Sequence, residues 1–251
     1  MFLEERHQQI LELLDRHGRV AVPDLARRFK VTEDCIRKDL KQLVADGKCR
    51  RVYGGATKVE DTIEINVSDR LNSFLPEKQA IAQKAIDLLK PHQTVFLDIS
   101  TTNLCFARLI AKASLPCTVV SPMIDVHMAL AHNPHVKAIC PGGTMHGDLN
   151  GFVGAMTVDA LSRFRFDLAF CGAYGLDIDA RTVSTYEADD GLVKHAAIER
   201  ASKRYLVCES RKLGVYGNYT YADFDDFDAL ICDDADKDNI ELVREAGLDV
   251  L

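Results

Sequence analysis

From residue 77 onward, short apolar runs alternate with amphipathic segments, and this alternation constrains the fold more than any other feature of the sequence. The apolar runs have the length and composition of buried strands. They are TVFLD, CTVVS, VKAIC, DLAFCG, RYLVCE and DALICDD. Segments of helical periodicity separate most of these runs. The order predicts an α/β domain, in which a parallel sheet carries helices on both faces.

The residues that follow the predicted strands indicate a ligand site. In parallel α/β folds, ligands bind at the carboxyl ends of strands, where loops lead into helices. TVFLD closes with Asp98, and Ser100, Thr101 and Thr102 then precede a helix. Hydroxyls and backbone N–H groups at a helix N-terminus suit a phosphate group. This loop is therefore the first candidate for binding a phosphorylated ligand.

Glycines follow other predicted strands at the same edge of the sheet. They are Gly143, Gly172 and Gly175. Glycine lets the backbone approach a ligand closely. Any one of these loops is explained as well by a tight turn with a Ser or Thr cap. Several such loops at one edge favour a ligand site.

The first 58 residues carry a different pattern, in which apolar residues recur at helical spacing in three successive segments. The first segment ends at Gly18, the second begins at Pro23, and the third follows Thr32, a favourable N-cap. The third helix would bury a stripe made of Ile36, Leu40, Leu43 and Val44. This spacing predicts a helix-turn-helix, whose second helix enters the major groove of DNA.

Basic residues occupy the opposite side of this third helix and the segment after it. Two extended runs around Gly54 and Gly55 would form a wing that carries basic residues to the phosphate backbone. A solvated helix face is the alternative for the basic helix taken alone, but the capped helix and the basic hairpin together favour DNA. The residues of this predicted DNA-binding surface are Thr32, Arg37, Lys38, Lys41, Arg50, Arg51 and Tyr53.

Charge is unevenly distributed along the chain, which carries a formal net charge of -7. Residues 1–58 contain 13 Lys and Arg against 9 Asp and Glu, whereas the remainder contains 18 against 29. A basic module attached to an acidic domain is typical of a protein that binds a polyanion through one part only. No apolar run approaches the roughly 18 residues that span a bilayer, and we expect a cytoplasmic protein without a membrane partner. The eight cysteines are scattered, and we expect most of them to be reduced core residues.

The stretch VTEDCIRKDLKQLVADGKCRRVYGGA, residues 31–56, resembles the signature of the DeoR family of bacterial transcriptional regulators. The family motif reads V-S-x-x-T-I-R-R-D-L, then L-x-x-x-G, then a basic pair before an aromatic residue and Gly-Gly-Ala. The positions that match it are Ile36, Arg37, Asp39, Leu40, Gly47, Arg50, Arg51, Gly54, Gly55 and Ala56. The resemblance implies an operator-binding regulator, most often a repressor of a carbohydrate-utilisation operon.

The rest of the chain also resembles this family, whose effector domains are similar to the folds of ribose-5-phosphate isomerase and glucosamine-6-phosphate deaminase. The resemblance implies a Rossmann-like domain that binds a phosphorylated sugar or related metabolite, with no cofactor. It also implies that the loop from Ser100 to Thr102 holds the phosphate and that Lys194 or Lys212 neutralises it. Asp98 or Glu187 would then bond sugar hydroxyls or a basic partner. Pro122 and Tyr174 depart from the family pattern and would reshape the pocket.

The sequence therefore predicts a winged helix-turn-helix at residues 1–58, a linker at 59–76 and an effector-binding α/β domain at 77–251. A dimer or tetramer is expected, because such modules act in pairs on repeated half-sites. An isomerase-like enzyme is one alternative, because Glu187 and Lys212 could supply a base and an electrophile. A metal-responsive regulator using His127, His132 and His135 is another. We expect neither catalysis nor a bound metal, because a DNA-reading helix does not serve turnover and the histidine spacing does not suit a metal.

Overall fold

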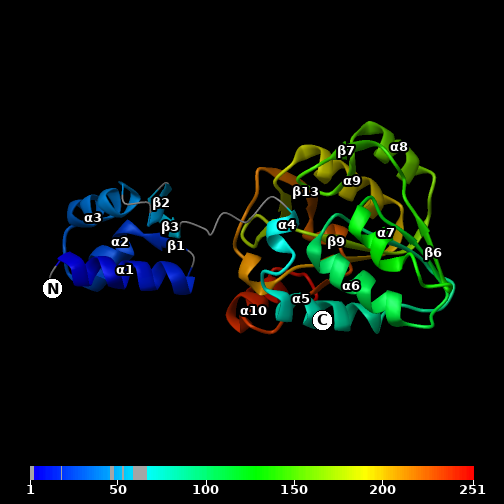
Figure 1. The fold of residues 1–251 in the computed structure, drawn as a ribbon. Helices are drawn as coiled ribbons and strands as arrows, with labels where there is room; N and C mark the ends of the chain where they lie inside the picture. The colour runs from blue at the N-terminus through cyan, green and yellow to red at the C-terminus, as the bar shows by residue number, and fades with distance from the viewer. Residues whose placement is uncertain (1–2, 18, 46–47, 53, 59–66) are drawn as a thin grey trace. The chain divides into compact units, whose positions relative to one another are not determined.

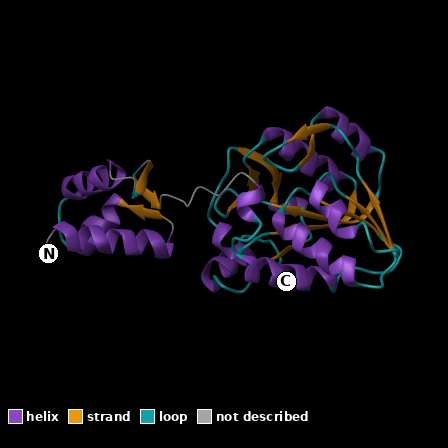
Figure 2. Cartoon of the chain, viewed as in Figure 1, coloured by secondary structure: helices purple, strands orange, loops and turns teal. Residues whose placement is uncertain are grey.

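The computed structural model describes residues 3–17, 19–45, 48–52, 54–58 and 67–251. The chain divides into two compact units, residues 1–63 and residues 64–251 (Figure 1). Each unit has its own cluster of buried apolar side chains. Figure 2 shows that the described part of the first unit is mainly helical, whereas the second mixes helices and strands.

The first unit combines a helix-turn-helix with a small antiparallel sheet. Its elements are α1 Leu3–His17, β1 Arg19–Ala21, α2 Val22–Phe29, α3 Glu33–Ala45, β2 Cys49–Val52 and β3 Gly55–Lys58. The strand order is β1-β3-β2. Gly54 lies between β2 and β3 with a φ of 78°, a conformation that favours glycine. The described residues confirm the predicted winged helix-turn-helix.

Local sequence signals set the helix boundaries in this unit. Pro23 occupies the first turn of α2, and Lys30 ends that helix in a left-handed conformation. The Thr32 hydroxyl accepts a hydrogen bond from the Cys35 backbone N–H at 3.3 Å, as an N-cap does. The side chains of Ile36, Leu40 and Leu43 are buried, as the sequence predicted, whereas Val44 is only half-buried. Burial of each such side chain contributes about 2 kcal/mol, so α3 is held mainly by its apolar stripe.

The second unit is built on a six-stranded parallel sheet. Its strands are β4 Thr94–Leu97, β5 Cys117–Val120, β6 Val136–Ile139, β9 Phe166–Gly172, β12 Ala201–Val207 and β14 Ala229–Ile231. Their order is β14-β12-β9-β4-β5-β6, and all neighbouring pairs are parallel. The six predicted strands all lie in this sheet, which confirms the α/β prediction.

Helices cover both faces of the sheet. They are α4 Val67–Arg70, α5 Leu75–Ile86, α6 Thr101–Lys112, α7 Ile124–Leu130, α8 Ala155–Ser162, α9 Ala188–Glu199, α10 Lys237–Glu245 and the short 3-10 helices η1 Ser210–Lys212 and η2 Phe224–Asp226. The chain places β5 and β6 on one side of β4 and the later strands on the other. Because crossovers are right-handed, this reversal sends the helices to opposite faces. Helices α5, α6 and α7 pack side by side, and α8 packs with α9 (Figure 1).

Two small antiparallel sheets lie outside the main sheet. The first pairs β7 Thr144–His146 with β8 Gly151–Val153. The second has the order β10-β11-β13 and consists of Gly175–Asp177, Thr182–Thr185 and Tyr219–Asp223. The sequence analysis predicted neither of them. Their strands are only three to five residues long, which is too short for alternation to stand out.

Part of the segment predicted as a linker is ordered within the second unit. Val67, the first residue of α4, is buried in the apolar core of that unit. Helix α5 begins at Leu75, two residues before the predicted start of the effector domain. Residues 59–66 of the predicted linker lie outside the described residues. The described fold of the second unit therefore begins at α4.

Six cysteines are buried, as expected of core residues: Cys49, Cys105, Cys117, Cys171, Cys208 and Cys232. Cys140 is exposed and Cys35 is half-buried, so these two are not core residues. Within the described ranges, no helix is long and apolar enough to cross a membrane.

Candidate functional site

The strand order creates a switch point at the carboxyl ends of β4 and β9. Strand β4 comes first in the chain, its successors β5 and β6 lie on one side of it, and β9 pairs with its other side. The loops that leave β4 and β9 therefore diverge to opposite faces of the sheet. Such a divergence is where ligands bind in open α/β sheets. Asp98 follows β4 directly, and Gly172 ends β9.

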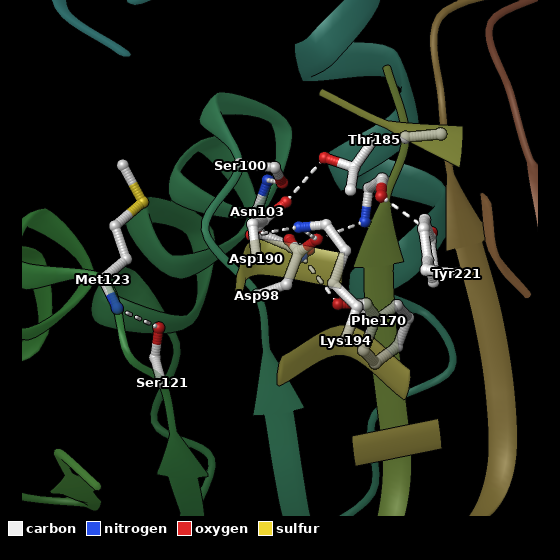
Figure 3. Close-up of polar contacts among 12 residues, drawn as sticks. Asp98, Ser100, Asn103, Ser121, Met123, Phe170, Thr185, Asp190, Lys194 and Tyr221 are labelled. Carbon is white, nitrogen blue, oxygen red and sulfur yellow. Dashed lines mark hydrogen bonds and ion pairs between the residues drawn. The ribbon is translucent and has the colours of Figure 1, made fainter. Parts of the chain in front are cut away.

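The Asp98 carboxylate is the centre of a buried polar cluster at this point (Figure 3). Its Oδ1 accepts a hydrogen bond from Asn103 Nδ2 at 2.7 Å, and its Oδ2 accepts one from the Gly172 backbone N–H at 2.6 Å. Lys194 Nζ lies 2.6 Å from the same Oδ2. A buried carboxylate needs several such partners to remain charged. The arrangement ties β4, the start of α6, the end of β9 and helix α9 together.

Lys194 also contacts a second carboxylate, one helical turn earlier on α9. Its Nζ lies 2.9 Å from Asp190 Oδ1, and the Thr185 hydroxyl donates to Asp190 Oδ2 at 2.7 Å. Burial alone would lower the pKa of Lys194, but Asp190 and Asp98 outweigh burial and raise the pKa above its usual value. One ammonium thus faces two carboxylates. By residue type this Asp98–Lys194–Asp190 cluster carries a formal charge of -1, and the nearby Arg70 guanidinium is attracted to both of its carboxylates, which opposes the lowering of the Arg70 pKa by burial.

The start of α6 borders the Asp98 cluster. The Ser100 hydroxyl caps the helix by accepting the Asn103 backbone N–H at 3.1 Å, and Thr101 and Thr102 are buried in the first turn. A Cβ atom at Gly172 would lie 2.9 Å from Ser100 Cβ, so glycine is required for this close packing. The structure therefore brings four predicted residues together around Asp98. They are Ser100, Gly172, Lys194 and Thr101, the last of which is the first residue of α6.

A second buried cluster lies at the end of β12 and also reaches β9. Lys212 Nζ is 2.7 Å from Glu209 Oε2, and Lys78 Nζ is 3.7 Å from Glu209 Oε1. Burial would raise the pKa of Glu209, but Lys212 and Lys78 outweigh burial and lower it to about 2. Lys212 also donates to the Ala173 carbonyl at 3.0 Å, next to Gly172. The Glu209 cluster, made of Glu209, Lys78 and Lys212, thus carries a formal charge of +1 beside the Asp98 cluster.

Three other predicted ligand residues have a different environment. A Cβ at Gly143 would lie 2.0 Å from Thr157 Oγ1, and one at Gly175 would lie 2.2 Å from the Val215 carbonyl oxygen. Packing within the chain therefore explains both glycines without a ligand. Glu187 is the half-buried N-cap residue of α9, and its side chain forms no cap hydrogen bond.

Four residues in or beside the Asp98–Lys194–Asp190 cluster were not predicted from the sequence. They are Asn103, Asp190, Thr185 and Tyr221, whose hydroxyl donates to the Gly172 carbonyl at 2.8 Å. Asp190 had a sequence signal, because it precedes Lys194 by four residues on one helix face. Asn103 follows the Ser-Thr-Thr loop that was singled out. Thr185 and Tyr221 come from β11 and β13, the sheet that the sequence did not predict.

Tyr174 and Pro122, which depart from the family pattern, form contacts within the chain. The Tyr174 ring centre lies 5.9 Å from that of Tyr186, with the rings tilted by 40°. The Pro122 carbonyl accepts the Phe152 backbone N–H at 2.9 Å. Ser121, at the end of β5, accepts the Met123 backbone N–H through its hydroxyl at 3.2 Å (Figure 3). These contacts belong to loops of the same sheet edge.

In the first unit, α3 presents three basic side chains to solvent. Lys38 and Lys41 are exposed, and the Arg37 side chain is 50% exposed. The Arg37 guanidinium contacts Glu33 Oε2 at 2.6 Å and Asp34 Oδ1 at 2.7 Å. Because these carboxylates are exposed and one turn away, DNA phosphates can compete for the guanidinium. Thr32, the other predicted residue of this helix, is exposed and acts as the N-cap.

The wing residues are only partly described. Arg50 and Arg51 lie in β2, whose backbone pairs with β3, and their side chains lie outside the described part. Tyr53 lies outside the described residues altogether.

A buried ion pair fixes α3 against α1, a role that the sequence analysis did not assign. Arg6 Nε lies 2.6 Å from Asp39 Oδ2, and Arg6 Nη2 donates to Asp39 Oδ1 at 3.0 Å. The hydrogen bond to Asp39 raises the pKa of Arg6. Asp39 is one of the motif residues, and its partner lies 33 positions earlier in the chain.

The described residues contain no group of three or more His, Cys, Asp and Glu side chains that could hold a metal ion. The three histidines considered in the sequence are spread out. His127 Nε2 lies 2.8 Å from the Ser121 carbonyl, and His132 and His135 are exposed.

Comparison with known proteins places both units. A DeoR-like helix-turn-helix domain matches residues 6–62, and a DeoR C terminal sensor domain matches residues 74–234. The transcriptional regulator GolR of Listeria innocua is 29% identical and covers 100% of this chain and 98% of its own length. The transcriptional repressor GlcR of Bacillus subtilis is 29% identical, with coverages of 97% and 96%.

A third relative is the glycerol-3-phosphate regulon repressor of Escherichia coli, which is 29% identical over 84% of this chain and 82% of its own length. Among solved structures, ribose 5-phosphate isomerase A of Methanocaldococcus jannaschii matches with 13% identity and a TM-score of 0.40. That match covers 58% of this chain and 54% of the isomerase. Similarity at this level carries no argument about function.

Proposed function

Because the chain belongs to the DeoR family of DNA-binding transcriptional regulators, we propose that it represses an operon of carbohydrate metabolism and that a sugar phosphate controls it. The repressors named above, GlcR and that of the glycerol-3-phosphate regulon, support this direction. A regulator of this kind acts in the cytoplasm, where the operator is. The expectation that the chain catalyses no isomerisation stays a prediction.

The DNA-binding surface that we propose is the exposed side of α3 together with the wing. Arg37 and Lys38 would face the major groove, with Arg37 exchanging its carboxylate partners for DNA, and Lys41 would contact a phosphate. Arg50, Arg51 and Tyr53 would contact the phosphate backbone from the wing. The Arg6–Asp39 pair would hold α3 at the angle that DNA requires.

The observation that carries the effector proposal is the Asp98 cluster at the β4–β9 switch point, next to the first turn of α6. Its carboxylate oxygens suit the hydroxyl groups of a sugar, which donate hydrogen bonds to carboxylates. The phosphate would lie at the α6 start, against Ser100, Thr101 and Thr102. Lys212, from the adjacent cluster of charge +1, would balance it. Lys194 is already paired with two carboxylates, so its role would be to orient Asp98 and Asp190.

Effector binding must reach the DNA-binding unit to control transcription. We propose a dimer or tetramer with residues 1–58 as the DNA-binding part and residues 77–251 as the effector-binding part. A coupling free energy of about 1–3 kcal/mol between the two sites would change operator affinity by roughly 5- to 150-fold.

A thermal-shift screen tests the effector class. The panel is glucose 6-phosphate, fructose 6-phosphate, ribose 5-phosphate and glycerol 3-phosphate, each beside its unphosphorylated parent. At 100 times its dissociation constant, a ligand stabilises the folded chain by about 2.7 kcal/mol. We expect a phosphorylated compound to raise the Tm of the wild type, and Thr101→Val and Lys212→Ala to reduce that shift. Thr118→Val on β5 is the control and should respond like the wild type. A shift with unphosphorylated sugars only would contradict the proposal.

A further inference from the structure

The turn between α4 and α5 follows the first described helix of the second unit. Phe74 ends this turn with a φ of 53°, a left-handed conformation that disfavours residues with a Cβ atom. Such a conformation persists only where the surroundings hold it, and it is common in switch regions.

Two cationic side chains hold this turn. Lys78 Nζ donates to the Arg70 carbonyl at 2.7 Å and to the Ser73 carbonyl at 2.6 Å, and the Lys78 side chain is only 2% exposed. The Arg211 guanidinium lies 3.9 Å from the centre of the Phe74 ring, a cation–π contact. Lys78 comes from α5, whereas Arg211 comes from η1, far along the chain.

The segment 209–212 contacts both the turn and the proposed effector site. At one side Glu209 faces Lys78, and Arg211 covers Phe74. At the other side Lys212 donates to the Ala173 carbonyl, directly after the residue whose N–H binds Asp98. A chain of polar contacts therefore runs from the Asp98 cluster to the carbonyls of the α4–α5 turn.

The charges along this series of polar contacts make it responsive to an anion. Lys78 and Lys212 share the single carboxylate of Glu209. Burial lowers the pKa of Lys78, and Glu209 opposes that effect. A phosphate that engages Lys212 would leave Glu209 to Lys78 and draw the Lys78 ammonium from the Arg70 and Ser73 carbonyls. The strained turn would then lose its hydrogen bonds from the Lys78 ammonium.

We propose that Lys78, Glu209 and Arg211 transmit occupancy of the effector site to the α4–α5 turn and thereby to the chain leading to the DNA-binding unit. These are positioning residues, because they act through the turn and not on the DNA. The inference rests on the proposed function, and it names the residues that couple the two sites.

The test uses the full chain, an operator duplex selected from a random DNA library, and the four sugar phosphates of the screen as probes. Calorimetry gives the Kd of the probe, and fluorescence anisotropy gives the operator Kd with and without it. The variants are Lys78→Met and Arg211→Met. Asn133→Ala is the matched control, because it removes three hydrogen bonds to carbonyls at the C-terminal end of α6 without touching the segment 209–212.

Without probe, we expect both variants to bind the operator within about threefold of the wild type, and the effect of the probe is compared at concentrations that saturate each protein according to its own probe Kd. The probe should change the operator Kd of the wild type by 5- to 150-fold. In Lys78→Met that ratio should fall at least about fivefold, with a smaller fall in Arg211→Met. Asn133→Ala should keep the wild-type ratio. This pattern would distinguish a loss of coupling between the two sites from a loss of probe or operator binding.

If the probe changes the operator Kd of Lys78→Met as much as that of the wild type, the inference is overturned. If Lys78→Met does not fold, the same result in Arg211→Met overturns it. An equal loss in Asn133→Ala also overturns it, because general destabilisation would then account for the effect. A wild type that binds none of the probes overturns the proposed function itself, and the coupling inference with it.

Discussion

The lysines of α3 and the lysines at the sheet edge differ in exposure and in partners. Lys38 and Lys41 are exposed on the DNA-binding unit. Lys78, Lys194 and Lys212 are at most 7% exposed, and each lies within 3.7 Å of a buried carboxylate. Lysine side chains are thus accessible to a polyanion in one unit, whereas in the other they belong to a network of buried ion pairs.

This difference indicates two modes of recognition. Exposed cations attract DNA through a salt-dependent field and contribute little to folding. Buried cations are part of the folded structure, so a ligand that binds there must exchange with partners already present. A ligand at the sheet edge can therefore change the fold locally, which a regulator requires.

The largest expected effect comes from removing the Lys194 charge. Lys194→Met leaves Asp98 and Asp190 buried without their shared cation, so it should destabilise the second unit by about 4 kcal/mol. The Tm should fall by roughly 10 °C. Lys203→Met is the control, because Lys203 lies 2.7 Å from Asp228 but is exposed. Its Tm should change by less than about 2 °C. Equal losses in the two variants would break the comparison.

Glu209 provides a pH test of the same buried network. Its pKa is lowered from 4.5 to about 2, because Lys212 and Lys78 outweigh its burial. Its stabilisation is therefore fully present above about pH 4.5 and is lost as the pH falls toward 2, by about 3 kcal/mol in total. Urea unfolding at pH 5, 4 and 3 should show this loss in the wild type and a weaker one in Glu209→Gln. The same pH dependence in both proteins would remove Glu209 from that role.

Asp39 sharpens the comparison, because it forms a buried pair with Arg6 in the same unit as the exposed lysines of α3. Asp39→Asn weakens the two contacts with Arg6 and should destabilise the first unit by about 2 kcal/mol. Chemical denaturation followed by helical circular dichroism measures this loss. Asp24→Asn, which removes an exposed carboxylate on α2, should leave stability unchanged. Wild-type stability in Asp39→Asn would show that the pair does not hold α3.

The sequence predicted the elements that carry strong periodicity and missed those set by distant contacts. The stripe of α3 and the six parallel strands were predicted, because burial of their apolar residues repeats with a fixed period. The short strands β10, β11 and β13 were not: β10 and β11 form a local hairpin but are too short for alternation to stand out, and β13 pairs with β11 from about 40 residues away. Thr185 and Tyr221 come from that sheet, so no local pattern could place them beside Asp98.

The candidate site was partly predictable for the same reason. Asp98 and Ser100 follow one strand directly, and their position at a sheet edge follows from chain order alone. The pairing of Lys194 with Asp98 spans almost 100 residues and depends on α9 crossing the sheet. The role of Lys78 depends on Glu209, at the end of a different strand. Charges of opposite sign in one sequence do not reveal which of them meet.

The smallest expected effect on stability belongs to the exposed cations. Lys41→Ala and Arg51→Ala should leave the Tm unchanged within about 2 °C and weaken binding to all DNA sequences about equally. Each should lower the slope of log Kd against log salt by about 1 if it contacts one phosphate. Lys112→Ala, at the end of α6 in the other unit, is the control. An unchanged slope would remove that residue from the DNA surface.

Operator binding by the full chain, titrated with and without a sugar phosphate at fixed salt, tests the central claim most directly. We expect the phosphorylated compound to change the operator Kd by 5- to 150-fold, and its unphosphorylated parent to have no such effect. An operator Kd that stays the same with every sugar phosphate would contradict the account of the sheet-edge site. The absence of any sequence-specific duplex would contradict the account of α3.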